Sequence, residues 1–255
     1  NFLLNLSKFL MLKKILSYPL SIIFYLGYGL TLVIMHVIQW LCYNIGGYKA
    51  HHKSVKLLNR ILVDLTKIFG TSYTYSGSEN LIKGVPLIFV SNHQSMYDVS
   101  PMEYDLSEYH PKFISKIELG SGIPSVSYNL RHGGSALIDR KNGKQAIEEI
   151  KKLALYIQEN NYSAIIYPEG TRSKDGKPKP FKENGLKVLT KYAKDAYIVP
   201  VTINNTWQIT QNGSFPLYVG AKVNLHYHKP LKVSDYKFDE LLALTEQTVK
   251  NSITA

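Results

Sequence analysis

A histidine and an aspartate follow a short apolar run in the first half of the chain. The run Leu87 to Ser91 leads into Asn92 and His93, and Asp98 lies five residues beyond His93. On a straight helix two such residues point about 140° apart, so they can meet only where the chain bends, as at a strand-to-helix junction. An aspartate that accepts the Nδ1 proton fixes the histidine tautomer and leaves Nε2 free to take a proton from a hydroxyl. The pair predicts a general base, and the alternative is a structural histidine.

A second polar run, Pro168 to Arg172, follows the apolar run Ser163 to Tyr167. A given pentapeptide arises by chance in about one of ten thousand chains of this length, so this run carries more weight than the first. Its composition suits a phosphate: Gly170 lets the backbone approach closely, Thr171 supplies a hydroxyl, and Arg172 presents a rigid fork of donors.

Two further cations end apolar runs. Arg140 comes just after Ser135 to Ile138 and Asp139, and Lys116 closes the run Lys112 to Lys116. Either residue could add a positive charge to the same phosphate, although an isolated Lys or Arg is more often a solvated surface charge.

Together these residues resemble the glycerolipid acyltransferases, most closely the bacterial-type members that acylate lysophosphatidate. The resemblance covers about residues 80 to 205 and consists of four matching blocks. In chain order they are Asn92-His93-x4-Asp98, the Gly133 to Arg140 stretch ending Ile138-Asp139-Arg140, Tyr167-Pro168-Glu169-Gly170-Thr171-Arg172, and Ile198-Val199-Pro200-Val201. The third block is the most specific.

The resemblance implies a role for each matching residue. His93 would be the catalytic base and Asp98 its orienting partner, and Pro200 would shape the acyl side. A lysine followed by Glu-Leu, as at Lys116 to Leu119, is also frequent in the family. The segment Gly120 to Asn129 departs from the family pattern, which leaves the acyl chain length open. The acceptor's glycerol phosphate would be served by Lys116, Arg140, Glu169, Gly170, Thr171 and Arg172.

The implied reaction moves a fatty acyl group from a thioester, either acyl carrier protein or coenzyme A, to the free hydroxyl of lysophosphatidate. The product is phosphatidate, an intermediate of phospholipid biosynthesis, and neither a cofactor nor a metal is implied. Two alternatives stay open: an acyltransferase for another lyso-lipid, and a non-catalytic membrane lipid-binding protein. His93 with Asp98 separates the last alternative from the enzymes, since binding needs no base.

The elements that must position these residues begin after Gly70, where short apolar runs alternate with helical stretches. This alternation predicts an α/β catalytic domain over residues 71–255, with a mostly parallel sheet flanked by helices. Ligands gather beyond the carboxyl ends of such strands. Expected strands are 87–91, 112–116, 135–140, 163–167 and 197–203, with a late strand or hairpin in 218–231, and expected helices are 143–159, 182–194 and 236–252.

Residues 1–70 differ in composition and predict a membrane-associated helical element. Ile15 to Tyr48 contains no Asp, Glu, Lys or Arg, and Ile22 to Tyr43 would reach roughly 33 Å as a helix, so the segment could span a bilayer or sit shallowly in one leaflet. Lys53 to Phe69 has the apolar period of a basic amphipathic helix. We expect such a helix to lie in a membrane interface, and the less favoured alternative is a helix packed on its own globular core.

The net charge of +11 is concentrated near the N-terminus. Residues 1–67 hold eight Lys and Arg against Asp64, so 8 − 1 = +7 flanks the apolar segment. This placement favours an anionic phospholipid surface as partner, on the cytoplasmic face of the inner (plasma) membrane if the protein is bacterial. A nucleic-acid partner is not expected, because its binding charge would lie on the folded domain. A serine hydrolase is disfavoured, since the Gly133 to Leu137 run lacks the closing glycine of a nucleophile elbow.

Overall fold

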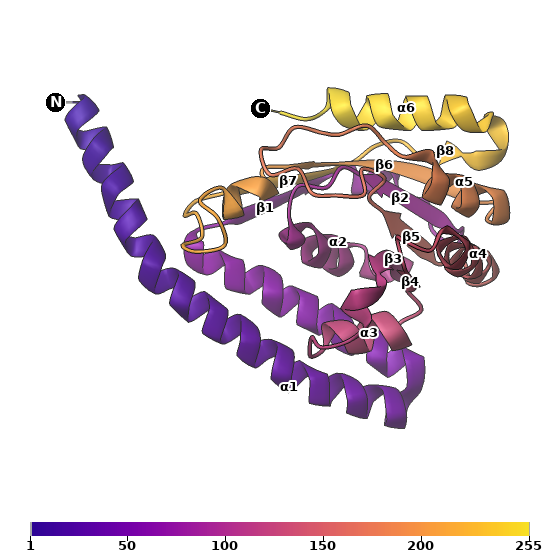
Figure 1. Cartoon of the computed structure of the whole chain (residues 1–255), viewed down its shortest axis with the longest axis horizontal. Coiled ribbons are helices and arrows are strands. Elements are labelled where there is room, and N and C mark those ends of the chain that lie inside the picture. Colours follow the sequence, from indigo (N-terminus) through magenta and orange to yellow (C-terminus); the bar gives the residue numbers. More distant parts are fainter. Residues whose placement is uncertain (1, 255) are drawn as a thin grey trace.

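The computed structural model describes residues 2–254, with side chains at Lys8 and from residue 11 onward, and has an α/β architecture (Figure 1). Its helices are α1 (Phe2–Thr66), α2 (Val99–Asp105), α3 (Val126–His132), α4 (Gly143–Asn160), α5 (Glu183–Tyr192) and α6 (Phe238–Asn251). Its strands are β1 (Ser72–Ser76), β2 (Leu87–Ser91), β3 (Pro111–Lys116), β4 (Ala136–Ile138), β5 (Ser163–Ile166), β6 (Tyr197–Asn204), β7 (Lys222–Tyr227) and β8 (Leu231–Lys232).

The strands form one mixed sheet in the order β1-β7-β6-β2-β5-β3-β4, with β8 also paired to β6. Only β7 and β8 run antiparallel to β6 among the described pairings, so the predicted mostly parallel sheet is confirmed. The carboxyl ends of β2, β5, β3 and β4 therefore meet at one edge. Residues that follow these four strands are brought together there.

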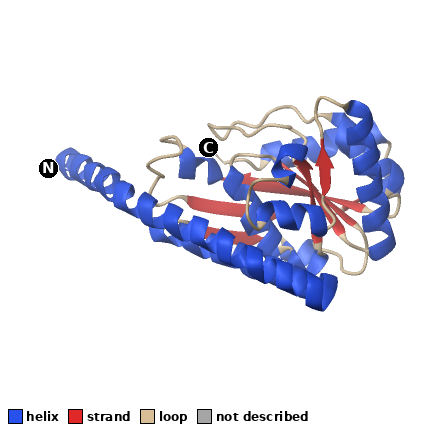
Figure 2. Ribbon diagram, turned by 60° about the horizontal axis from the view of Figure 1, so that its bottom comes forward, coloured by secondary structure: helices blue, strands red, loops and turns tan. Residues whose placement is uncertain are grey.

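The central strands are buried on both faces, as their continuous apolar runs predicted. Leu87 and Phe89 of β2 share a core cluster with Phe24 of α1 and Met102 of α2. Ile88 and Val90 point the other way, into a cluster built with residues of α4, α5 and α6. Helix α1 with α2 thus covers one face of the sheet, and α4, α5 and α6 cover the other. Figure 2 shows helices on both sides of the strands.

Helix α4 shows how the sequence sets these packing faces. Asn142 caps its start by accepting the backbone N–H of Gln145 at 3.1 Å, and Asn161 ends it in a left-handed conformation. Its buried residues Ile150, Leu153, Ala154 and Ile157 follow the helical period. Each large apolar side chain buried there contributes roughly 1.5–3 kcal/mol of transfer free energy.

Helix α1 is a hairpin rather than one continuous rod. Gly47 has φ 64° and ψ −160°, and the backbone breaks there, so the first arm (residues 2–46) and the second arm (residues 48–66) run back alongside each other (Figure 1). A positive φ of this kind is sterically free only for glycine. A short 3₁₀ helix, Lys67–Phe69, follows α1 and ends at Gly70, and β1 starts two residues later. Treating residues 1–70 as a separate domain stays a prediction.

The second arm packs most of its apolar stripe on the protein. Val55, Leu58, Leu62 and Val63 are all buried, Leu58 and Leu62 lie in a cluster with Leu32 and Met35 of the first arm, and the hairpin also contacts α2. The expectation that the apolar stripe of Lys53 to Phe69 lies in a membrane interface is therefore wrong. The helical period showed which face is buried, but it could not show what covers that face.

The first arm has two faces of different character. One face buries Phe24, Leu32 and Met35 against the protein. The other leaves large apolar side chains exposed along the arm, including Leu26, Leu30 and Ile45 at 69%, 61% and 82%. By length and composition alone, Met11–Phe69 contains a helical stretch that is long and apolar enough to cross a membrane. Contiguous exposed apolar surface of this extent favours association with a membrane.

Candidate active site

A tight turn after β2 brings His93 and Asp98 together. Ser95 is extended and caps the short 3₁₀ helix Met96–Asp98, where its hydroxyl accepts the Tyr97 N–H and the Asp98 carboxylate accepts the Ser95 N–H. This reciprocal capping box folds Asp98 back over the residues that precede the helix. The expected bend is therefore present at the strand-to-helix junction, and the predicted contact is confirmed.

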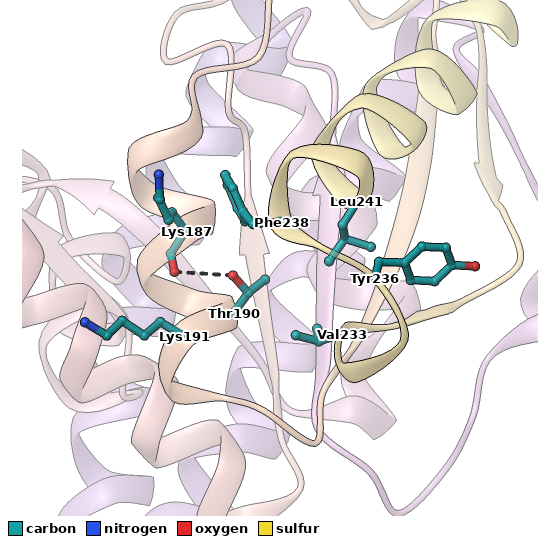
Figure 3. Close-up of a pocket in the computed structure, with 7 residues that line it drawn as sticks. All are labelled: Lys187, Thr190, Lys191, Val233, Tyr236, Phe238 and Leu241. Carbon is teal, nitrogen blue, oxygen red and sulfur yellow. Dashed lines mark hydrogen bonds between the residues drawn. The ribbon is translucent and has the colours of Figure 1, made fainter.

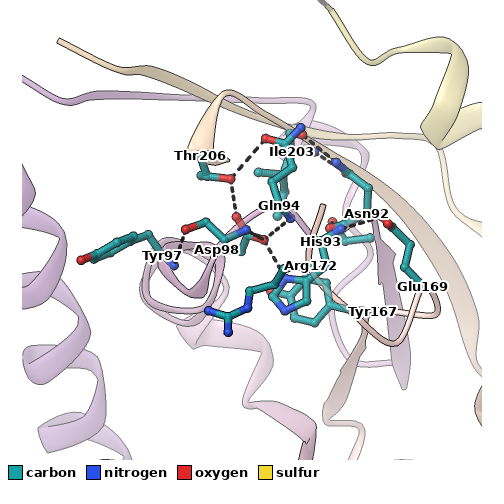
Figure 4. A network of polar contacts seen from close by, with 12 residues as sticks. Asn92, His93, Gln94, Tyr97, Asp98, Tyr167, Glu169, Arg172, Ile203 and Thr206 are labelled. Carbon is teal, nitrogen blue, oxygen red and sulfur yellow. Dashed lines mark hydrogen bonds and ion pairs between the residues drawn. The ribbon is translucent and has the colours of Figure 1, made fainter. Parts of the chain in front are cut away.

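His93 Nδ1 lies 2.7 Å from Asp98 Oδ2, and the backbone N–H groups of Gln94 and Ser95 donate to the same oxygen at 2.8 and 2.9 Å (Figure 4). The Thr206 hydroxyl donates to the other oxygen, Oδ1. The Asp98 side chain is completely buried, whereas that of His93 is 18% exposed. None of the described residues makes a hydrogen bond to His93 Nε2.

The His93 ring stacks on Tyr167, with 4.1 Å between ring centroids and 18° between planes. The Tyr167 hydroxyl donates to Met102 Sδ at 3.4 Å, and burial raises the pKa of Tyr167 well above its ordinary value, so the phenol stays neutral. The imidazole is held by an aspartate at its edge and by an aromatic ring at its face. The sequence offered one signal for Tyr167, an aromatic residue directly before Pro168. It offered none for Thr206, which lies more than a hundred residues from Asp98.

Asn92 joins the site to the neighbouring strand. Its side-chain amide donates to the Ile203 carbonyl and accepts the Ile203 N–H, both at 2.8 Å. This pair fixes the end of β2 against β6. Pro200 also lies on β6, buried and opposite Val90 within the sheet, and the structure does not bring it into the polar group around His93.

Glu169 fastens two backbone segments together. Its Oε1 accepts the His93 N–H at 2.8 Å and its Oε2 accepts the Lys179 N–H at 3.0 Å. The residue is only 2% exposed, and burial raises the pKa of its carboxyl despite those two hydrogen bonds. Because both oxygens are occupied by backbone donors, the structure gives Glu169 a positioning role beside His93.

The loop after Glu169 presents the other residues of the motif. Gly170 has φ 71°, and its carbonyl accepts a hydrogen bond from Arg140 Nη1 at 2.5 Å. Thr171 and Arg172 are exposed, and the Arg172 side chain lies on the same side of the strand ends as the His93 ring (Figure 4). The structure thus brings Arg140 and the Gly170–Arg172 segment to one place.

Lys116 reaches the same edge from β3. It is exposed and pairs in register with Ile138 of β4, two residues before Arg140. The two cations therefore lie at the ends of adjacent strands. No contact joins Lys116 to the described residues around His93.

Two hollows of the described surface lie away from this site. A shallow one of about 320 Å³ sits between α5 and α6, where Thr190 Oγ1 donates within its own helix to Leu186 and Lys187 carbonyls (Figure 3). Its lining contains no histidine, cysteine or acid. Across residues 2–254, no group of three or more His, Cys, Asp or Glu side chains is placed to hold a metal ion.

Comparisons with known proteins agree with this geometry. Residues 72–204 match the family model described as Acyltransferase. The chloroplastic 1-acyl-sn-glycerol-3-phosphate acyltransferase of Brassica napus is 31% identical over 156 residues, which are 61% of this chain and 44% of that protein. The enzyme of the same name from Helicobacter pylori is 33% identical over 135 residues, 51% of this chain and 54% of that one. The chain spans about half the length of the curated relatives it matches.

A solved structure resembles nearly the whole chain. The crystal structure of the 1-acyl-sn-glycerophosphate (LPA) acyltransferase from Thermotoga maritima matches with a TM-score of 0.78 and 25% identity. The match covers 94% of this chain and 95% of that one, so it includes the N-terminal hairpin as well as the sheet.

Proposed function

The chain belongs to the acyltransferase family, and we propose that it transfers a fatty acyl group from an acyl thioester to the free hydroxyl of 1-acylglycerol-3-phosphate, giving phosphatidate. The observation that carries this proposal is the His93 imidazole, with Nδ1 on the buried Asp98 carboxylate and Nε2 without a partner among the described residues. A base held in one tautomer beside a cationic loop suits an acceptor that has both a hydroxyl and a phosphate.

In the proposed reaction, His93 Nε2 takes the proton of the acceptor hydroxyl while the hydroxyl oxygen attacks the thioester carbonyl. A C–O ester bond forms and the C–S bond breaks. The departing thiolate then takes the proton from the His93 imidazolium. The Asp98 carboxylate stabilises that imidazolium, and such a positioned base contributes about 10² to 10⁴ in rate.

Ser95 is not needed as a nucleophile. Its hydroxyl accepts the Tyr97 N–H and caps the 3₁₀ helix, so it has a structural function two residues from the base. No acyl-enzyme is formed in this scheme.

The acceptor phosphate would be gripped by Arg172 and Thr171, with Arg140 and Lys116 as the next positive charges. Arg140 already donates to the Gly170 carbonyl, so it fixes the loop as well as adding charge. Charge-assisted phosphate hydrogen bonds are worth about 1.5–3 kcal/mol each. An Arg172→Ala variant should therefore raise the KM for the acceptor, and an unchanged KM with intact activity would place the phosphate elsewhere.

The substrates also suit the exposed face of the first arm. Lysophosphatidate resides in membranes, and apolar side chains such as Leu26 and Leu30 would seat the arm in a phospholipid surface beside the site. In a bacterial cell this would be the cytoplasmic face of the inner membrane, where thioesters of acyl carrier protein and coenzyme A are both available as donors.

The full chain in detergent should convert lysophosphatidate to phosphatidate with one of the two donors, with the product resolved by mass. A His93→Ala variant should lose about 10² to 10⁴ in turnover, whereas Ser95→Ala should retain most of it. Absence of phosphatidate with either donor would overturn the proposal. A Ser95→Ala variant as inactive as His93→Ala would point to a serine nucleophile instead.

A further inference from the structure

Lys179 lies ten residues after Glu169, beyond a polar turn, yet its side chain returns to the motif. Its ammonium Nζ donates to Thr171 Oγ1 at 2.8 Å and to the Arg172 carbonyl at 3.0 Å. Its backbone N–H donates to Glu169 Oε2 at 3.0 Å. One residue therefore contacts Glu169, Thr171 and Arg172, and through Glu169 it is linked to the His93 backbone.

These contacts leave two hydrogen-bond donors of Lys179 and Thr171 available to a ligand. An ammonium group has three donors, and two are used on Thr171 and Arg172, which leaves one. The Thr171 oxygen accepts from Lys179, so its own proton is free to be donated outward. With the Arg172 guanidinium, these donors present positive charge and an O–H on one exposed loop.

The other lysines of this turn differ from Lys179. Lys177 is exposed, and its backbone N–H donates to Asp175 Oδ1 at 3.2 Å. Its ammonium makes no hydrogen bond or ion pair with the described residues, although its charge, added to that backbone hydrogen bond, helps to lower the pKa of Asp175. Solvation of this kind is usual for a lysine on a protein surface. Lys179 departs from it because its two side-chain bonds both fall on motif residues.

We propose that Lys179 is a further residue of the phosphate site: it orients Thr171 and Arg172 toward the acceptor phosphate and donates its third hydrogen bond to a phosphate oxygen. This inference rests on the proposed function for the identity of the acceptor. It adds a residue outside the four sequence blocks that defined the site.

Binding is the first test, because it does not depend on turnover. A short-chain, water-soluble lysophosphatidate is titrated into the full chain in detergent by calorimetry. Lys179→Met keeps the length of the side chain but removes its donors, and should raise the Kd roughly five- to tenfold. Lys179→Arg should stay within about twofold of wild type, and so should the matched control Lys177→Met.

A double-mutant cycle tests whether Lys179 acts through Thr171. Thr171→Val should weaken binding by itself, and adding Lys179→Met to it should cost less than Lys179→Met costs in the wild type. Effects that simply multiply would mean that the two residues act separately, which overturns the orienting role. In turnover assays the single variant Lys179→Met should raise the acceptor KM with kcat nearly unchanged. Equal thermal midpoints for Lys179→Met and wild type exclude a general folding defect.

Lys179→Met binding as tightly as wild type, or no weaker than Lys177→Met, would overturn the proposal, and so would a wild-type chain that does not bind the probe. A chain that binds the probe with this Lys179 dependence but transfers no acyl group to it would overturn the proposed function and leave the Lys179 inference standing.

Discussion

One oxygen of the Asp98 carboxylate contacts both the His93 ring and the backbone of the two residues that follow His93. Asp98 Oδ2 lies 2.7 Å from His93 Nδ1 and accepts the N–H groups of Gln94 and Ser95. The carboxylate is therefore fixed relative to the imidazole by the turn itself, and a change in the turn would move both groups together.

Asp98→Asn should lower kcat by about 10² to 10⁴ with the acceptor KM little changed, because a neutral amide no longer stabilises the imidazolium that forms in the reaction. Steady-state kinetics with lysophosphatidate measures this. Asp175→Asn is the matched control, since Asp175 is an exposed aspartate on a nearby loop that accepts from Ser173 and Lys177. Equal kcat values for the two variants would contradict the assigned role of Asp98.

Thr206 supplies the donor to the second Asp98 oxygen, and both side chains are completely buried. Thr206→Val keeps the shape but leaves that oxygen without its partner, which should cost about 1–3 kcal/mol of stability and lower kcat. Thr206→Ser retains the hydroxyl and should recover most of both. Chemical denaturation and turnover of the two variants check this, and a Val variant as active and as stable as wild type would refute it.

The sequence was most informative where one local pattern determines the structure. The run Leu87 to Ser91, apolar up to Val90, predicts a strand buried on both faces, and β2 is one. The edge strand β1, Ser72–Ser76, alternates exposed and half-buried residues and carries mostly polar side chains, so no apolar run marked it. Similarly, the contact between His93 and Asp98 could be predicted because it requires only a bend within the five residues that separate them.

Long-range partners could not be read from the sequence in this way. Thr206 meets Asp98 only because the loops after β6 and β2 converge at one edge of the sheet. Lys179 lies eight residues from Thr171 and meets it because the loop after β5 turns back on itself, and no motif marked that turn. The residue types of the third block predicted a phosphate cradle, yet Glu169 is used between two backbone segments. Composition shows which groups are present at a site, and only the fold shows which of them are already occupied.

The role of Glu169 can be separated from acceptor binding by kinetics. Glu169→Gln keeps one carbonyl oxygen but places an NH₂ group against the N–H of His93 or Lys179, so one buried donor loses its acceptor at a cost of about 1–3 kcal/mol. Displacement of the His93 backbone should lower kcat more than it raises the acceptor KM. A variant whose KM rises while kcat stays unchanged would instead place Glu169 in contact with the acceptor.

Acid should loosen the packing of the hairpin on the catalytic domain. His52 stacks on His110 with 4.2 Å between ring centroids, and its Nε2 donates to the Ser107 carbonyl at 2.8 Å. Burial, together with the nearby His110 and Lys112, lowers the pKa of His52 to about 4 from an ordinary 6.5. The unfolded chain therefore binds this proton more readily than the folded chain. The stabilising contribution is complete above pH 6.5 and is lost as the pH falls from 6.5 toward 4.

Thermal unfolding of the full chain between pH 8 and pH 4.5 measures this effect. The apparent Tm of the wild type should fall below pH 6.5, and His52→Gln, which has no proton to gain, should show a smaller fall. Above pH 7 the two proteins should differ by a constant amount. Parallel curves throughout the acid range would show that His52 does not contribute to the pH dependence.

Membrane binding should depend on the exposed face of the first arm. Leu26 and Leu30 are 69% and 61% exposed and lie one helical turn apart, so Leu26→Glu with Leu30→Glu adds two charges to this face without disturbing a packed core. A charge in the hydrocarbon region costs about 2.5–3.5 kcal/mol on insertion scales, so binding to anionic vesicles should fall by more than tenfold. Ile147→Glu on α4, where Ile147 is 51% exposed, is the control because α4 covers the opposite face of the sheet. Cosedimentation with vesicles should separate the variants, and equal loss in both would mean that the surface charge of the whole protein, rather than this face, determines membrane binding.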